Sequence, residues 1–285
     1  MKISVVICTF NRPEDCIETV QSILDQANTY LHEIIVVDDC SKSPFKFNHD
    51  KVKIIRNNRE VGLSASRNIG VKASSGDIIC FIDDDAIAAP DWIKRIQDTI
   101  CNGADIVGGI AEPLYLSPPP KWWVADLFGF FVGIKNKDII GTNFAVKKEV
   151  FNKIGYFNED LGRKGGILIS CEEIEFRERA KKAGLKLMFD ENIKVYHKVS
   201  SKKMTISYLI YRAWGQGISK VILKKSKEKS ISPSVFPFSK KSLYIFVKAI
   251  RHKIVLLPIV LVLIFFLKIV FWISVFYFSY FNKLD

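Results

Sequence analysis

The sequence predicts an α/β fold, in which a mostly parallel, Rossmann-like sheet flanked by helices is followed by a C-terminal membrane-associated helical tail. Short apolar runs rich in β-branched residues alternate with helical patterns through the first half of the chain, which favours a parallel sheet. The stretch 254–281 is apolar apart from one charge, Lys268, and predicts the tail. At 285 residues the chain has room for one large α/β domain and an appendage.

The elements of the α/β part follow in order along the chain. Residues 3–8 form a continuous apolar run typical of a buried strand, and Pro13 suits the first turn of a helix over 14–25. Further strands are expected at 33–37, 51–56 and 78–82, and further helices at 62–73 and 172–183. This alternation predicts one nucleotide-binding-like α/β unit in the first half.

Carboxylates directly follow two of these strands. They are Asp38 and Asp39 after the strand at 33–37, and Asp83, Asp84 and Asp85 after the strand at 78–82. Because the carboxyl ends of parallel strands meet at one edge of a sheet, we expect one set to bind a base or ribose. The other set would hold Mg²⁺ or Mn²⁺ on phosphates. The alternative for the run of three is a solvated acidic turn, which is common on protein surfaces.

Two arginines are candidates for neutralising those phosphates. The sequence contains no G-x-x-x-x-G-K-[ST] motif, and no G-x-G-x-x-G follows the first strand, so a P-loop ATPase is not supported. Arg12 and Arg67 remain, since a guanidinium pairs with phosphate in a fork geometry. For Arg67 a helix-surface cation is the alternative.

Five segments in this order resemble the family 2 glycosyltransferases, which have the GT-A fold. They are SVVICTFNRPE, IIVVDDCS, VGLSASRNIGVKASSGDIICFIDDDA, GTNFAVKKEVFNKIGYFNEDLG and CEEIEFRERAKKAG. The resemblance covers residues 2 to about 197. It implies an inverting transfer from a nucleotide-activated sugar with a divalent metal, Mn²⁺ or Mg²⁺.

The resemblance also implies roles for single residues on the donor side. Thr9 and Asp39 would contact the base with Asp38 beside them, and Asp84 would approach the ribose and diphosphate. Asp85 would ligate the metal with help from Asp83. The implied donor-binding set is Thr9, Asn11, Arg12, Asp38, Asp39, Arg67, Asp83 and Asp84. His197 lies where family members sometimes have a metal or phosphate ligand, and a structural histidine is the alternative.

The catalytic base is expected at Glu172 or Glu173. A sugar hydroxyl is a poor nucleophile at neutral pH, so a carboxylate must take its proton as the new bond forms. The family places an Asp there, after a Glu, and this chain has Glu-Glu instead, with Glu173 at the base position. Which of the two acts stays open, and the alternative is that both merely complement the dipole at the N-terminus of their helix.

Acceptor-side residues are less clearly marked. The segment GTNFA at 141–145 resembles the acceptor-side strand of the family, so Asn143 is a candidate polar contact. Trp122 and Trp123 follow a proline-rich segment and could stack on a sugar or lie near a membrane, while a core or rim role is equally open.

The net charge of +12 comes from one part of the chain. Residues 1–197 carry 26 basic and 28 acidic side chains, whereas residues 198–253 carry 14 basic side chains against Glu228 alone. A helix over 200–222 looks amphipathic, with a basic face. The residues that suggest this pattern are Tyr208, Tyr211, Arg212, Trp214 and Gln216. The distribution argues against nucleic acid as a partner and favours anionic membrane lipids.

The tail is long enough to span a bilayer once with tilt, or to form a hairpin, and a buried core helix is the alternative. The basic residues before it are expected to place the preceding domain on the cytoplasmic side. They are Lys240, Lys241, Lys248, Arg251 and Lys253. The run at 3–8 is too short for a signal peptide, so none is expected. The six scattered cysteines suggest free thiols in a reducing compartment rather than a zinc site.

We therefore expect a GT-A glycosyltransferase domain at 1–200, with a nucleotide-binding half at 1–110 and an acceptor and catalytic half at 111–200. A basic amphipathic region and connector would follow at 201–253, and a membrane segment at 254–281. The expected activity moves a sugar from a UDP-, GDP- or dTDP-sugar to a membrane-proximal acceptor. The favoured acceptor is a lipid-linked saccharide in cell-surface polysaccharide synthesis. The enzyme is expected at the cytoplasmic face of the inner membrane.

Two rival functions remain. One is a non-catalytic membrane scaffold that keeps the nucleotide-sugar-binding fold. The other is a metal-dependent nucleotidyltransferase, which would need a Gly-rich phosphate loop with Arg and Lys near residue 10, and the sequence has none there. The donor sugar, linkage and oligomeric state are left open.

Overall fold

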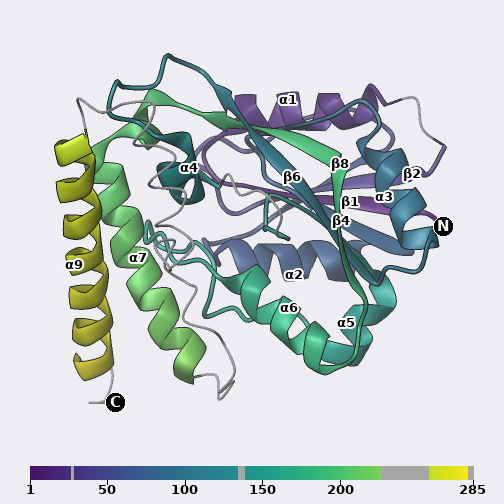
Figure 1. Ribbon diagram of the computed structural model, residues 1–285. Coiled ribbons are helices and arrows are strands. Elements are labelled where there is room, and N and C mark those ends of the chain that lie inside the picture. The colour runs from purple at the N-terminus through teal and green to yellow at the C-terminus, as the bar shows by residue number, and fades with distance from the viewer. Residues whose placement is uncertain (27–28, 134–138, 226–256, 282–285) are drawn as a thin grey trace. The chain divides into compact units, whose positions relative to one another are not determined.

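The computed structural model describes residues 1–26, 29–133, 139–225 and 257–281 (Figure 1). The chain divides into two compact units. The first comprises Met1–Leu114, Lys135–Gly165 and Glu172–Lys198, and the second comprises Tyr115–Ile134, Gly166–Cys171 and Val199–Asp285. The predicted connector, the basic residues Lys240, Lys241, Lys248, Arg251 and Lys253, and residues 254–256 of the predicted tail lie outside the described residues.

The first unit is built on a sheet with helices packed against it. The strands are β1 Ile3–Thr9, β2 Leu31–Asp38, β3 Val52–Arg56, β4 Ile78–Ile82, β5 Ala86–Ala88, β6 Ile106–Tyr115, β7 Asn143–Lys147 and β8 Leu187–Val199. The helices are α1 Pro13–Leu24, α2 Leu63–Ala73, α3 Trp92–Cys101, α5 Lys148–Ile154 and α6 Glu172–Lys182. Each strand and helix that the sequence predicts in this region is present, within a few residues of its expected ends.

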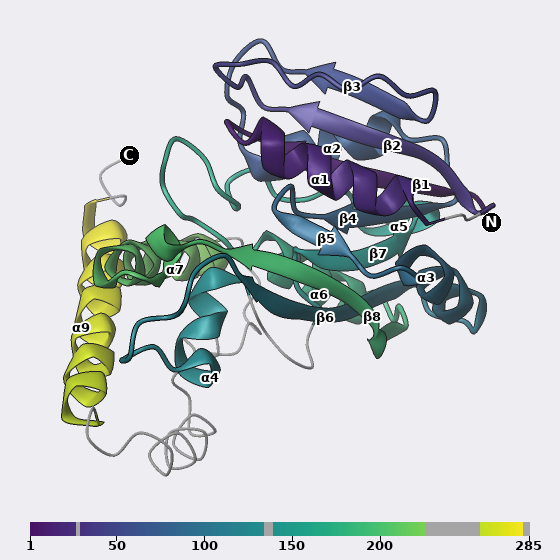
Figure 2. The same cartoon turned by 90° about the horizontal axis from the view of Figure 1, so that it is seen from above.

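The eight-stranded sheet has the order β3-β2-β1-β4-β7-β6-β8-β5. Figure 2 shows the first four of these strands, β3, β2, β1 and β4, one after another. β1 is parallel to β2 and β4, and β2 is parallel to β3, as predicted for the nucleotide-binding half. β7 is antiparallel to both β4 and β6, and β5 is antiparallel to β8. The sheet is therefore mixed, with parallel pairs among β1, β2, β3 and β4 and antiparallel pairs at β4–β7, β7–β6 and β8–β5.

Helices cover both faces of the sheet, which explains why the strands are apolar at consecutive positions. In β1, Val5 packs in a core that α1 and α3 complete, whereas Val6 packs in a second core with α2, α5 and α6. β4 alternates in the same way, with Cys80 toward the first core and Phe81 toward the second. Figure 1 shows α1 on one side of the sheet and α2 and α6 on the other.

Asn143, predicted as an acceptor contact, is instead a structural residue. Its side chain is fully buried at the start of β7. Its Oδ1 accepts a hydrogen bond from Trp92 Nε1 at 2.8 Å, and its Nδ2 donates to the carbonyls of Ile110 and Ile193 at 2.9 and 3.0 Å. These bonds join β7 to α3, β6 and β8 and use both amide N–H groups. Because the residue is 0% exposed, its side chain is not available to a substrate.

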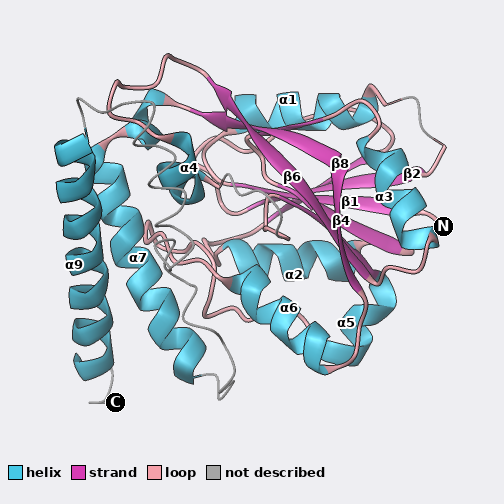
Figure 3. Cartoon of the chain, in the orientation of Figure 1, coloured by secondary structure: helices cyan, strands magenta, loops and turns pink. Residues whose placement is uncertain are grey.

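The second unit is mostly helical and contains α4 Ala125–Phe128, two short 3-10 turns at Gly129–Val132 and Ser201–Met204, α7 Ile206–Lys225 and α9 Leu257–Phe281 (Figure 3). Trp123 is 3% exposed in its core, so of the alternatives left open for this residue the core role is the one that holds. Within the described residues, Ile259–Tyr280 is the one helical stretch long and apolar enough to cross a membrane, judged by length and composition alone.

Helices α7 and α9 pack closely through small residues. A Cβ on Gly217 would lie 2.7 Å from the carbonyl oxygen of Phe271, and Ser274 Oγ donates to the carbonyl of Trp214 at 2.7 Å. The predicted basic face of α7 is wrong at its centre, because Arg212 is buried and donates to the carbonyls of Phe131 and Leu168. Gln216 is also buried, since backbone carbonyls and neighbouring side chains of this unit attract both polar groups inward.

We expect Asn143→Ala to lower the free energy of unfolding by at least about 3 kcal/mol, because it leaves one buried indole N–H and two buried carbonyls unpaired. Denaturant unfolding of the detergent-solubilised chain measures this. Asn102→Ala, at an exposed position after α3, is the control and should change stability by less than about 0.5 kcal/mol. Full stability of Asn143→Ala together with a raised acceptor KM would restore the acceptor-contact role.

Candidate active site

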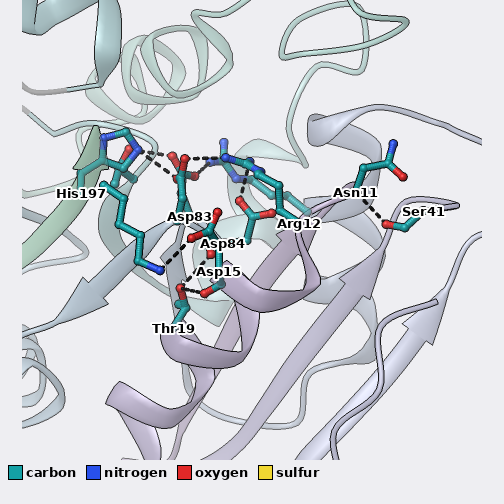
Figure 4. Close-up of polar contacts among 12 residues, drawn as sticks. Asn11, Arg12, Asp15, Thr19, Ser41, Asp83, Asp84 and His197 are labelled. Atoms are coloured by element: carbon teal, nitrogen blue, oxygen red, sulfur yellow. Dashed lines mark hydrogen bonds and ion pairs between the residues drawn. The ribbon is translucent and has the colours of Figure 1, made fainter. Parts of the chain in front are cut away.

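The predicted donor-side residues meet at the edge where β1, β2 and β4 end. Thr9 at the end of β1 pairs with Asp38 at the end of β2, and Asp83, Asp84 and Asp85 follow β4 directly. Figure 4 shows the side chains of Arg12, Asp83, Asp84 and His197 directed toward one another. The expectation that the two acidic strand ends open on the same edge is confirmed.

Three side chains form a cluster with the composition of a metal site. Asp83, Asp85 and His197 each offer a ligand atom, and these atoms lie within 4.8 Å of one another. His197 comes from β8, whose pairing with β5 sets it opposite Ala86, and its Nε2 lies 3.0 Å from Asp85 Oδ1. Two carboxylates and an imidazole are a donor set that suits a divalent transition metal, so the residues present fit the predicted cation.

Burial and mutual repulsion shape the charges of the three aspartates. Burial raises the pKa of Asp84 to about 7, and its acidic neighbours add to this, although Arg12 opposes it. Burial also acts on Asp83, but its pKa is lowered because Arg67 lies beside it. Arg12 Nη2 lies 2.5 Å from Asp84 Oδ1, and Arg12 Nη1 lies 2.5 Å from Asp85 Oδ2. The three aspartates thus gather negative charge at the site, and the nearby Arg12 and Arg67 neutralise part of it.

Arg67, predicted to bind phosphate, is 3% exposed and held from several sides. Its Nη1 donates to Glu172 Oε1 at 2.7 Å, and its Nη2 donates to Asp83 Oδ1 at 3.2 Å and to the carbonyl of Gly141 at 3.0 Å. A Cβ on Gly141 would lie 3.1 Å from Arg67 Nη2, so glycine permits this close approach. The surface-cation alternative is excluded by this burial.

Asp38 and Asp39 use their carboxylates within the protein. Asp38 accepts hydrogen bonds from the backbone N–H groups of Ser41 and Phe45 and from Arg56 Nη1 at 2.5 Å. Asp39 accepts from the side chain of Asn57 and from the N–H groups of Val61 and Gly62, just before α2. Both side chains are buried, so the structure assigns them to holding the loops after β2 and before α2.

The loop after β1 is tied to the loop after β2. The carbonyl of Thr9 accepts from the N–H of Asp39 at 2.9 Å. Asn11 has a positive φ of 57°, and its N–H donates to Ser41 Oγ at 2.8 Å (Figure 4). Its side-chain oxygen accepts from the N–H of Lys42 at 2.8 Å. These bonds place Thr9 and Asn11 at the same edge as the aspartates.

The two glutamates at the start of α6 have different environments. Glu172 is 5% exposed and bound to Arg67, and its Oε2 has no hydrogen-bond partner among the described residues. Glu173 is half-buried. Burial, reinforced by the neighbouring Glu172, raises the pKa of Glu173 to about 7. Glu173 is therefore the more accessible of the two, and its raised pKa lets it gain and lose a proton near neutral pH.

One contact at the site has no sequence signal. Thr142 Oγ1 donates to Asp83 Oδ2 at 2.7 Å, which fixes the second oxygen of that carboxylate. The antiparallel register that pairs Ile82 with Asn143 sets the residues just beyond them, Asp83 and Thr142, side by side. Neither composition nor spacing reveals this register, so the contact becomes visible only in the folded chain.

We expect Asp38→Asn to lower the free energy of unfolding by about 1–3 kcal/mol at pH 7, because the amide cannot accept from Arg56 and both N–H groups equally well. Although burial opposes it, these hydrogen bonds lower the pKa of Asp38 in the folded state. Its stabilisation is thus present above the ordinary aspartate pKa and is lost as the pH falls below it. Thermal unfolding at pH 7 and pH 3.5 should show the difference from wild type shrinking in acid, and a constant difference would contradict this role.

Comparisons with known proteins agree with this geometry. The family model described as glycosyl transferase family 2 matches residues 4–155. A glucosyl-dolichyl phosphate glucuronosyltransferase of Haloferax volcanii is 30% identical over an alignment of 243 residues, and the match covers 78% of this chain and 77% of that protein. The dolichol-phosphate mannosyltransferase of Pyrococcus furiosus is 33% identical over an alignment of 179 residues, and the match covers 55% of this chain and 50% of that protein.

Solved structures show the same fold. A mannosyltransferase from Pyrobaculum calidifontis, in complex with GDP-Man and Mn²⁺, matches 92% of this chain and 73% of its own with a TM-score of 0.56 and 16% identity. This likeness, together with the mixed sheet flanked by helices, establishes the expected GT-A fold. On the family match and the identity with the Haloferax volcanii protein, the chain belongs to glycosyl transferase family 2 and is a glycosyltransferase.

Proposed function

We propose that the protein is an inverting glycosyltransferase that moves a sugar from a nucleotide-sugar donor to a lipid-linked saccharide at a membrane. The observation that carries the proposal is the sheet edge of the first unit. There, Asp83, Asp85 and His197 form a candidate cation site. Arg67 donates hydrogen bonds to Asp83 of this site and to Glu172, and Glu172 directly precedes the candidate base Glu173. Donor activation and acceptor deprotonation would thus be served by one connected set of side chains.

Asp83, Asp85 and His197 would hold the divalent cation. We favour Mn²⁺ over Mg²⁺, because Mg²⁺ usually takes oxygen ligands alone and this set includes an imidazole. The mannosyltransferase with GDP-Man and Mn²⁺ supports the choice by analogy. When bound, the cation would act as a Lewis acid on the departing nucleotide diphosphate.

The chain's own residues would bind the nucleotide around this cation. Thr9 and Asn11 lie on the loop after β1 and would border the base, while Asp84 and Arg12 would face the ribose and diphosphate. Asp38 and Asp39 would contribute by shaping the loops that enclose the base, since their carboxylates are occupied. Arg12, about one third exposed, would be able to exchange its carboxylate partners for phosphate oxygens.

Glu173 would act as the general base. It would take the proton of the acceptor hydroxyl while that oxygen bonds to the anomeric carbon and the bond from this carbon to the diphosphate breaks on the opposite face. Its pKa of about 7 suits this task, because the carboxylate is ionised in part at neutral pH and basic enough to accept a proton. Glu172 would stay paired with Arg67 next to the base.

A lipid-linked saccharide fits better than a bare lipid phosphate as acceptor. A phosphate is already an anion at neutral pH and needs no base, whereas a sugar hydroxyl does. The Haloferax volcanii relative is named for a glucosyl-dolichyl phosphate substrate, which is such a lipid-linked sugar. α9 would anchor the enzyme in the bilayer that holds this acceptor, with the catalytic residues on the cytoplasmic side.

The predicted division into a GT-A domain at 1–200, a basic region at 201–253 and a membrane segment at 254–281 is retained as part of this proposal. The compact units differ from it in one respect. Residues 115–134 and 166–171 belong with the helical second unit. We propose that these segments serve the acceptor side of the enzyme.

The first test is binding of UDP-, GDP- and dTDP-sugars to the full chain in detergent, measured by calorimetry with Mn²⁺ and with EDTA. We expect one nucleotide class to bind with Mn²⁺, and its affinity to fall at least about tenfold with EDTA or in Asp85→Ala. Asp98→Asn, exposed on α3, is the control and should bind like wild type. Should the folded protein bind none of these donors with Mn²⁺, the donor site is wrong and a membrane scaffold becomes the better account.

The second test is the pH dependence of kcat/KM with the donor so identified. We expect the rate to fall about tenfold for each pH unit below about 7, because protonated Glu173 cannot act as a base. Glu172→Gln removes the neighbouring negative charge, so it should move this acid limb to lower pH. Glu173→Gln should lose a factor of about 10² to 10⁴, while Glu178→Gln on the same helix serves as control. Equal activity of Glu173→Gln and Glu178→Gln would remove Glu173 from the mechanism.

A further inference from the structure

We propose that Arg67 is a positioning residue, which ties the cation-side carboxylate Asp83 to Glu172 and thereby fixes the start of α6 beside the base, rather than a ligand of the donor phosphates. The inference rests on the proposed function, because it assigns Arg67 a role between the two halves of that site. It replaces the donor-binding role that the sequence alone suggested for this residue.

The contacts of Arg67 come from segments far apart in the chain. The residue lies on α2, yet its two terminal nitrogens reach Glu172 at the start of α6, Asp83 after β4 and the carbonyl of Gly141 before β7. A planar guanidinium can make these bonds in fixed directions at the same time, and a lysine ammonium on a flexible stem cannot. One side chain thus sets the separation between the cation site and the residue preceding the base.

The surroundings of Arg67 leave little room for a phosphate. Its side chain is 4% exposed, and its guanidinium carbon lies 5.9 Å from the ring centres of Phe81, Phe144 and Phe157. Gly141 closes another side, since even a Cβ there would lie 3.1 Å from Nη2. Arg12 differs in this respect, because its side chain is 32% exposed at the same edge. Of these two arginines, Arg12 is the one placed to meet a donor.

Charge gives Arg67 a second effect on the cation site. A fixed positive charge beside Asp83 competes with a divalent cation for the same carboxylate. Asp83 does not depend on Arg67 alone for its orientation, because Thr142 holds its other oxygen. Removal of the guanidinium should therefore leave Asp83 in place and make it a better cation ligand, although catalysis is lost.

The experiment compares wild type, Arg67→Met, Arg67→Lys, Glu172→Gln and the double variant Arg67→Met/Glu172→Gln, all as full chains in detergent. Arg95→Met, exposed on α3, controls for loss of one positive charge. Mn²⁺ alone is titrated first, followed by UDP and GDP in the presence of Mn²⁺. Turnover is then measured with whichever nucleotide sugar the wild type uses.

For Arg67→Met we expect Mn²⁺ to bind about threefold tighter or more, the nucleotide Kd to stay within about threefold, and kcat to fall at least about 100-fold. Arg67→Lys should recover less than a tenth of the lost kcat. The double variant should be no slower than Arg67→Met, because the two residues act as one unit, and it also removes the unpaired buried carboxylate that could prevent folding.

Two results would overturn the inference. The first is a nucleotide Kd at least about tenfold weaker in Arg67→Met with kcat retained, which marks a phosphate ligand. The second is Mn²⁺ affinity that is unchanged or weaker in that variant. If the wild type binds Mn²⁺ but uses no nucleotide sugar, the proposed function fails, and the inference is then judged by the Mn²⁺ titrations of the folded variants alone.

Discussion

The structure of the first unit depends on crowding several carboxylates at one edge of a sheet and supplying counter-charges for them. Asp83, Asp84 and Asp85 follow a strand whose five residues are all buried, so they leave the sheet in a place with limited access to water. Burying adjacent carboxylates is unfavourable unless cations or hydrogen-bond donors compensate. Arg12 comes from the loop after β1 and Arg67 from α2, so the requirement for compensation draws separate elements onto the same edge.

The same requirement explains why the loops at this edge are so densely hydrogen-bonded. The carboxylates of Asp38 and Asp39 accept hydrogen bonds from backbone N–H groups of the segments 41–45 and 61–62. These carboxylates therefore organise the loops at this edge of the sheet, in place of the direct ligand contacts that a strand-end position suggests. A rigid loop framework lowers the ordering cost when a nucleotide binds.

The antiparallel strands add what the parallel half lacks. β7 runs beside β4 and brings Thr142 to Asp83, and β8 runs beside β5 and brings His197 to Asp85. Asn143 holds β7 against its neighbours through three side-chain hydrogen bonds. The second unit packs α7 on α9 through glycine and serine, as helices do when backbones approach closely in an apolar setting.

The strands, helices and acidic strand ends of the first unit could be predicted from the sequence. The contacts between them depended on strand pairing and on side-chain burial, which could not. Continuous apolar runs such as that of β4 are a local property, so strands, helices and the acidic strand ends were recognisable without a structure. Register and burial are not local. The contact of Thr142 with Asp83 requires the antiparallel pairing of β4 and β7. The burial of Arg67, Arg212 and Asn143 requires hydrogen-bond partners that lie up to 105 residues away in the chain.

By itself the sequence determined which residues carry charge and where strands end, because these follow from residue type and periodicity. Only the tertiary structure decided which charged side chains are held inside the fold and which stay accessible at the sheet edge, because partners for buried polar groups come from distant segments.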